Sequence, residues 1–308
     1  MAGCRPRQRP AARGLPVTLD PERTVDAGRE LPRRSVRLPD GSDLAYVASG
    51  EGPPVVLLHG TLTVLEDMML ALAASLTPRR RVIAFDRPGF GRSSWRRFVD
   101  AGLWRQAERL HEALSVLGID RPIVVGHSFG ASVALAMAMR RPERVRGVVA
   151  LAPLAAPELR LEHLLFAGRS TPNLGPWMSG VAAASSDRSL YPLLWRAMYL
   201  PQAMPEAVQA SFPFDLAARA GSAIRIGEDS AAVLADLVVL NAAAAVCPVP
   251  VRILAGDRDL VVRNDLHGPR LAAMLPGGAF TPLPGLGHMV HHFAAAEIVH
   301  AVDEIAGA

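Results

Sequence analysis

The stretch VVGHSFGAS, residues 124–132, decides how this sequence is interpreted. Its centre, Gly126-His127-Ser128-Phe129-Gly130, has the form G-x-S-x-G, a pattern that also arises by chance in a chain with 26 glycines. The setting is therefore what matters. An apolar run before the pattern predicts a buried strand, and the residues after it have the spacing of a helix. Ser128 is thus expected at a sharp strand-to-helix turn that holds its hydroxyl clear of the sheet, with no room for side chains at 126 and 130.

Strand and helix patterns alternate on both sides of this turn. A hairpin is predicted at residues 35–50, around the turn Asp40-Gly41. Apolar runs typical of buried strands occur at 53–60, 81–86, 122–128, 144–153, 249–256 and 279–285. Helical patterns occur at 63–76, 100–117, 129–141, 231–247, 264–275 and 291–307. This alternation predicts an α/β fold with a mostly parallel, doubly wound sheet.

The regular alternation stops between residues 154 and 246, which are rich in proline and mainly helical in pattern. We therefore expect a core made of residues 34–153 and 247–308, with a helical cap inserted at 154–246. Residues 1–33 form an Arg- and Pro-rich tail that we expect to be disordered.

The net charge of +4 lies in this tail. Residues 1–34 contain eight arginines and four acidic residues, so the rest of the chain is formally neutral. The charge therefore indicates no nucleic-acid-binding face on the core.

The sequence patterns predict neither a secretory signal nor a membrane span. The tail has no apolar segment of the kind that a secretory signal needs. The longest apolar stretch, 231–247, is interrupted by Asp236 and Asn241 and is read as a buried helix rather than a membrane span. The two cysteines, Cys4 and Cys247, give no disulfide framework. We expect a cytoplasmic protein that binds a small-molecule substrate, with no membrane or nucleic-acid partner and no cofactor.

Five motifs in a fixed order resemble those of the α/β-hydrolase superfamily, in particular its capped serine hydrolases. They are LLHG (57–60), FDRPGFGRS (85–93), GHSFG (126–130), LAGDRD (254–259) and PGLGHMVHH (284–292). The ending GHMVHH and the dipeptide Glu228-Asp229 also resemble a group of bacterial hydrolases whose substrates are unassigned. The resemblance implies the α/β-hydrolase fold and catalysis by a nucleophile, an acid and a histidine, in that chain order.

The resemblance places these roles on particular residues. Ser128 would be the nucleophile, His288 the base and Asp259 the acid, as the fourth residue of G-x-x-D. Asp257 remains the alternative acid, whereas Glu158, after the preceding strand, has no support. The backbone amides of Thr61 and Phe129 would form the oxyanion hole.

Other polar residues receive structural interpretations. His59 is expected to hold its loop or line the pocket, and Asp86 to form a turn. Glu66 and Asp67 are expected to cap the first helix, with a place at the border of the pocket as the alternative. His291 and His292 are expected to be surface or packing residues. With His288 they have a spacing that could chelate a metal, but no carboxylate stands alongside them in the sequence, so no metal site is predicted.

The cap contributes Trp177 and Trp195 as pocket-lining candidates, although both could simply pack the cap onto the core. An apolar lid would suit an uncharged substrate of small or medium size.

Carboxylic-ester hydrolysis is the leading function. The same triad serves C–C bond hydrolases, lactonases, amidases and cofactor-free haloperoxidases, the last of which perform perhydrolysis. Haloalkane dehalogenases and epoxide hydrolases instead use aspartate as the nucleophile, which the serine here argues against. A slow or non-catalytic ligand-binding protein is the alternative from another class.

Overall fold

The fold is given by a computed structural model that describes residues 23–26, 29–158, 166–184 and 186–307. The first part of the tail, residues 1–22, lies outside the described residues. So does the short segment 159–165, which belongs to the predicted cap at 154–246.

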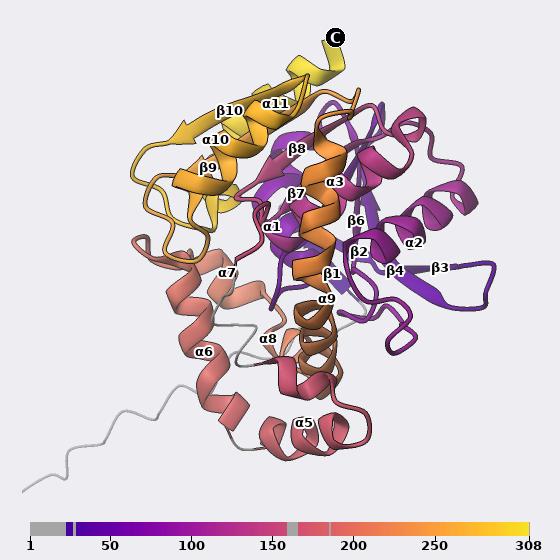
Figure 1. Cartoon of the computed structure of the whole chain (residues 1–308), viewed down its shortest axis with the longest axis vertical. Coiled ribbons are helices and arrows are strands. Elements are labelled where there is room, and N and C mark those ends of the chain that lie inside the picture. The colour runs from indigo at the N-terminus through magenta and orange to yellow at the C-terminus, as the bar shows by residue number, and fades with distance from the viewer. Residues whose placement is uncertain (1–22, 27–28, 159–165, 185, 308) are drawn as a thin grey trace, which may run out of the picture.

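An eight-stranded sheet forms the centre of the molecule (Figure 1), with the strand order β10-β9-β8-β7-β5-β6-β4-β3. The strands are β3 Arg34–Arg37, β4 Asp43–Ser49, β5 Pro54–Leu58, β6 Arg81–Phe85, β7 Ile123–His127, β8 Gly147–Leu151, β9 Val251–Gly256 and β10 Gly278–Leu283. The pairs from β6 to β10 are parallel, whereas β4 pairs antiparallel with β6 and with β3. The predicted fold class is therefore confirmed, including the hairpin at Asp40-Gly41.

Helices cover both faces of this sheet. They are α1 Leu65–Leu76, α2 Leu103–Val116, α3 Phe129–Arg140, α10 Asn264–Met274 and α11 Ala295–Gly307. One apolar cluster joins α1 and α11 to one face, and a second joins α2, α3 and α10 to the other. The strands between these clusters are buried on both faces, which explains their continuous apolar runs.

A helical cap separates β8 from β9, at the end of the molecule opposite the C-terminus (Figure 1). Its helices are α5 Leu174–Ala184, α6 Ser186–Tyr199, α7 Glu206–Ser211, α8 Phe214–Ala217 and α9 Ala220–Ala244, with a 3₁₀ turn at Ala167–Ser170. Helix α9 runs from the cap into the core, where its second half packs with α2 and α3. No helix of the described residues is long and apolar enough to cross a bilayer.

The structure differs from the expected division at the end of the tail. Strands β1 Arg23–Asp26 and β2 Arg29–Pro32 pair antiparallel, and Arg33 forms buried ion pairs with Glu66 and Asp86. The fold thus begins before residue 34, and Arg33 pairs with two buried carboxylates of the core. Charge composition alone could not reveal this pairing.

Candidate active site

Ser128 lies where β7 turns into α3, as predicted. Its backbone has φ 52° and ψ −120°, a conformation that costs a non-glycine residue energy and persists only where the surroundings impose it. The Ser128 N–H donates to the carbonyl oxygen of Leu151 on the neighbouring strand β8, at 2.8 Å. The turn is therefore held by the sheet itself.

The glycines on either side make this turn possible. A Cβ atom at position 126 would lie 2.3 Å from the carbonyl oxygen of Gly130. A Cβ atom at position 130 would lie 2.4 Å from the carbonyl oxygen of His59. Non-bonded contacts of a Cβ atom are not this short in proteins, so both positions require glycine, as the sequence predicts.

The two amides predicted to bind an oxyanion belong to segments that meet at Ser128. Phe129 is the first residue of α3, where a backbone N–H has no partner within its own helix. Thr61 follows Gly60, and a Cβ atom at Gly60 would lie only 3.2 Å from Cβ of Ser128. The structure thus brings the segment 59–61 against the serine turn, although the oxyanion role of its amide remains a prediction.

Asp259 and His288 are in direct contact. The Nδ1 atom of His288 lies 2.7 Å from Oδ2 of Asp259, and both side chains are almost fully buried. Asn264 Nδ2 donates to the same carboxylate oxygen at 2.7 Å. The amides of Val261 and Val262 donate to Oδ1. No sequence signal had singled out Asn264.

These contacts favour the ionised carboxylate. Burial acts to raise the pKa of Asp259, but the nearby His288 and the backbone amides outweigh it and hold the pKa below its usual value. An ionised Asp259 accepts the Nδ1–H of His288, which leaves Nε2 of the ring free to take up a proton.

The alternative acids lie elsewhere. Asp257 accepts a hydrogen bond from the N–H of Gly285 at 2.7 Å and so shapes the loop after β10. Glu158 lies 3.2 Å from Nε2 of His267. Of the three carboxylates considered, the structure pairs His288 with Asp259.

His127, the residue before Ser128, also contacts the histidine loop. Its Nε2 atom lies 3.1 Å from the main-chain oxygen of His288, and a carbonyl can only accept, so Nε2 carries the proton. The two imidazole rings lie 4.7 Å apart, centroid to centroid. The loop that carries His288 is thus attached directly to the serine turn.

The three pocket-lining candidates have different surroundings. His59 is fully buried, with Nδ1 2.8 Å from the Gly60 carbonyl and Nε2 accepting from the Arg87 N–H at 3.0 Å, so it holds the loop rather than lining a pocket. Trp177 is 66% exposed on α5, which argues against the pocket-lining role predicted for it. Trp195 is buried and donates from Nε1 to the carbonyl of Leu62 at 2.9 Å.

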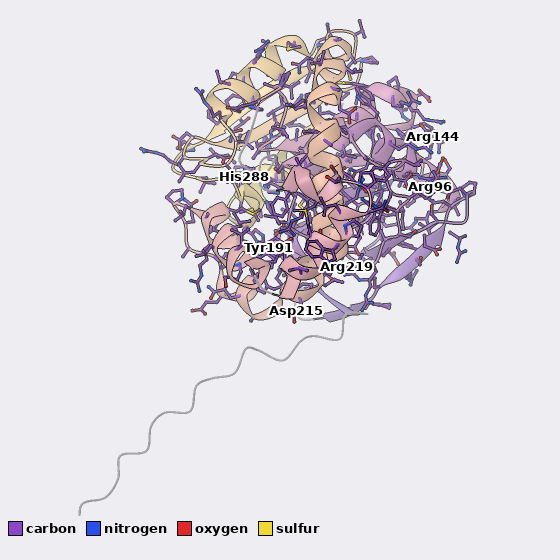
Figure 2. The ribbon with its side chains drawn as sticks, turned by 60° about the horizontal axis from the view of Figure 1, so that its bottom comes forward. Arg96, Arg144, Tyr191, Asp215, Arg219 and His288 are labelled. Carbon is purple, nitrogen blue, oxygen red and sulfur yellow. The ribbon has the colours of Figure 1, made fainter. Side chains whose placement is uncertain are left out.

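Trp195 belongs to an apolar cluster between cap and core. The cluster includes Leu62, which follows the segment 59–61, Met289 next to His288, and Tyr191 and Phe212 from the cap. Figure 2 shows Tyr191 on α6 and His288 in the core. Apolar side chains thus adjoin both the predicted oxyanion segment and the predicted base.

The loop after His288 is anchored by a buried carboxylate. Asp67 on α1 lies 3.1 Å from Nε2 of His291 and 2.8 Å from Nε2 of His292. The expected cap role of Asp67 is wrong, since the first amide of α1, that of Leu65, bonds instead to Asp86. His291 is fully buried and the His292 side chain is 3% exposed, so of the two predicted roles, surface or packing, the structure supports packing.

The same contact corrects the reason given for excluding a metal site. The ligand atoms of Asp67, His291 and His292 all lie within 4.8 Å of one another, so a carboxylate does stand beside the two histidines. It comes from a helix more than 200 residues earlier in the chain. Burial lowers the pKa of His291 to about 4, and in this neutral ring Nε2–H donates to Asp67.

Comparison with known proteins agrees with this architecture. A family model described as alpha/beta hydrolase fold matches residues 53–295. The chain belongs to the α/β-hydrolase family. A hydrolase of known structure from Pseudomonas aeruginosa superposes with a TM-score of 0.72 over 92% of this chain and 100% of its own, at 23% identity.

Curated relatives of this α/β-hydrolase have several activities. Haloalkane dehalogenase 2 of Mycobacterium tuberculosis is 27% identical over 278 residues, 84% of this chain and 90% of its own. A putative carbamate hydrolase of Klebsiella pneumoniae is 30% identical over 244 residues, 77% of this chain and 85% of its own. A 2-hydroxymuconate semialdehyde hydrolase of Pseudomonas putida is 33% identical over 174 residues, 55% of this chain and 59% of its own. The relatives are hydrolases that act on different bonds.

Proposed function

We propose that this protein is a serine hydrolase that cleaves a small or medium, largely apolar ester, or a related acyl bond, through an acyl-enzyme on Ser128. The observation that carries the proposal is the 2.7 Å contact between His288 Nδ1 and Asp259, in a loop bound to the serine turn through His127. The apolar cluster around Trp195 supports a substrate without charge.

The mechanism follows from the roles of these groups. His288, oriented by Asp259, removes the Ser128 hydroxyl proton through Nε2 as the oxygen attacks the acyl carbon. The amides of Thr61 and Phe129 stabilise the oxyanion, and His288 then protonates the leaving group. Water repeats the cycle on the acyl-enzyme, which releases the acid and restores Ser128.

The serine bears on the choice among the relatives' activities. Haloalkane dehalogenases of this superfamily attack with aspartate, whereas Ser128 occupies the nucleophile position here. We therefore propose acyl transfer rather than dehalogenation. The carbamate hydrolase and the semialdehyde hydrolase favour a carbamate or a C–C bond beside a carbonyl as second candidate substrates. Perhydrolysis on the same triad and a slow or non-catalytic ligand-binding role are the remaining alternatives.

The test is labelling with a fluorophosphonate, with the modified residue identified by mass spectrometry. Turnover of p-nitrophenyl acetate, p-nitrophenyl butyrate, an aryl carbamate and a vinylogous 1,5-diketone is measured in parallel. We expect label on Ser128 and ester turnover that disappears in Ser128→Ala. The matched control is Ser132→Ala, because the buried Ser132 hydroxyl already donates to Leu154 and its loss should leave labelling intact. A wild type that is neither labelled nor active on any of these substrates would contradict the proposal.

A further inference from the structure

Arg87 is a buried cation beside the predicted oxyanion hole. Its side chain is 0% exposed, and burial lowers its pKa to about 10, so the guanidinium is charged at neutral pH. Nε donates to the carbonyl of His59 at 2.8 Å, and Nη2 donates to the carbonyl of Gly60 at 3.0 Å. One side chain thus holds two successive carbonyls of the segment that leads to Thr61.

The contact with Gly60 bears directly on the Thr61 amide. The Gly60 carbonyl and the Thr61 N–H belong to the same planar peptide group, so a bond that fixes one also fixes the direction of the other. A charged donor on the carbonyl also polarises the peptide and strengthens the N–H as a donor. Arg87 therefore both aims and activates the Thr61 amide.

The same guanidinium contacts the residue that carries the second amide. Its central carbon lies 4.8 Å from the ring centroid of Phe129 and 4.4 Å from that of Phe90. Both distances are within the range of a cation–π contact. Arg87 is thus in contact with both segments from which the predicted oxyanion donors come.

Asp229 on the cap helix α9 completes the surroundings of Arg87. Its Oδ2 atom lies 3.6 Å from Nη1 of Arg87. Gln106 links the two residues, since it accepts from Nη1 at 2.8 Å and donates to Oδ1 of Asp229 at 3.0 Å. Arg225 also approaches Oδ1 of Asp229, at 2.8 Å. The carboxylate that pairs with Arg87 is therefore supplied by the cap and is shared with Arg225.

We infer that Arg87 is the positioning residue of the oxyanion hole and that Asp229 couples it to the cap. This inference rests on the proposed function. It gives a role in catalysis to Arg87, the second residue of DRPGFGRS, and to Asp229 of the Glu228-Asp229 dipeptide in the cap. The cap then contributes to catalysis, because Asp229 on α9 holds Arg87, which orients the Thr61 amide.

The test compares Arg87→Met, Arg87→Lys and Asp229→Asn with the wild type. We measure kcat and KM on p-nitrophenyl butyrate, the rate of Ser128 phosphonylation, and the inhibition constant of a trifluoromethyl ketone, whose adduct carries an oxyanion. Loss of one oxyanion donor lowers kcat by about 10²–10³-fold, and we expect a loss of this size in Arg87→Met with little change in KM. Phosphonylation and ketone affinity should fall in parallel. Arg87→Lys should recover only part of the loss, because an ammonium cannot span both carbonyls in the same fork, and Asp229→Asn should show a smaller loss with the same pattern.

The matched control is Arg169→Met. Arg169 is another buried guanidinium of the cap, bound to Asp187 at 2.7 and 2.6 Å, with no contact to the oxyanion segment among the described residues. Its variant should lose stability but keep the phosphonylation rate of its folded fraction. If folded Arg87→Lys and Asp229→Asn react at the wild-type rate, the inference is overturned. If the wild type itself is not labelled on Ser128, the proposed function fails and the inference fails with it.

Discussion

His127 donates a hydrogen bond from Nε2 to the main-chain oxygen of His288, at 3.1 Å. The residue before the predicted nucleophile thus determines where the loop of the predicted base lies. Among the described residues, Nδ1 of His127 has no partner, which is consistent with a neutral ring that is protonated on Nε2.

Replacing His127 with phenylalanine should test this link, because a ring remains but the donor is lost. The His288 carbonyl is then left buried without its partner, which costs about 1–3 kcal/mol of unfolding free energy. We expect the ester kcat to fall about tenfold through a misplaced His288. Urea unfolding and steady-state kinetics measure the two effects. A destabilised variant with wild-type kcat would show that the contact stabilises the fold without positioning the base.

Asp259 and Asp257 should differ sharply when each is changed to asparagine. In Asp259→Asn the amide no longer holds His288 in the required tautomer, and a loss of about 10⁴-fold in kcat is expected. Asp257→Asn retains an oxygen that accepts from the Gly285 N–H, so its kcat should stay within about threefold of wild type. Equal losses in the two variants would contradict the assignment of the acid.

Asp67 should contribute strongly to stability. Asp67→Ala leaves the two imidazoles of His291 and His292 buried without their acceptor, and a loss of about 2–4 kcal/mol in unfolding free energy is expected. The control is Asp303→Ala, which removes partly exposed pairs with Arg79 and Arg80 and should cost less than about 1 kcal/mol. Chemical denaturation of both variants measures the difference. Similar losses would show that the buried group stabilises no more than a surface pair.

Stability should fall as the pH drops below neutral. Burial holds the pKa of His59 and of His127 well below the usual value, and it lowers that of His291 to about 4. Histidines of the unfolded chain take up protons below about pH 6.5, while these buried rings stay neutral. Between about pH 6.5 and the pKa of the folded ring, each ring therefore lowers the unfolding free energy by about 1.4 kcal/mol per pH unit. Asp259 and Asp67 have lowered pKa values, so their contribution is lost only below about pH 4.

Urea midpoints measured from pH 7.5 to pH 4.5 test this pH dependence. We expect a steep fall between about pH 6.5 and 4.5, because the histidine window lies there. A midpoint that stays constant over this range would contradict the buried neutral state of these rings.

Trp195 should limit the size of the acyl group if the proposed function holds. Trp195→Ala removes a buried ring beside Leu62 and opens space next to the oxyanion segment. We expect the ratio of kcat/KM for p-nitrophenyl octanoate over acetate to rise by about tenfold. Trp177→Ala is the control and should leave this ratio unchanged, because that ring is exposed. An unchanged ratio in Trp195→Ala would assign Trp195 to packing alone.

Much of the fold could be predicted from the sequence because the signals are local. A strand buried on both faces needs an apolar run, and a helix on the sheet needs an apolar stripe. The turn at Ser128 needs glycine at 126 and 130, and the crowding around both positions is what the structure shows. The sequence by itself therefore determined the order of the elements and the place of the serine turn.

Only the tertiary structure decided which distant groups meet. The G-x-x-D pattern favoured Asp259 and left Asp257 open, and the contact of Asp259 with His288 depends on how the His288 loop lies against the end of β9. The links from His127 to His288, from Asp67 to His291 and from Arg87 to Asp229 each join segments more than 100 residues apart. Trp177 and Trp195 look alike in sequence, yet one is exposed and the other buried. Burial and pairing depend on packing in three dimensions, and a local pattern carries no information about which distant partner is brought alongside.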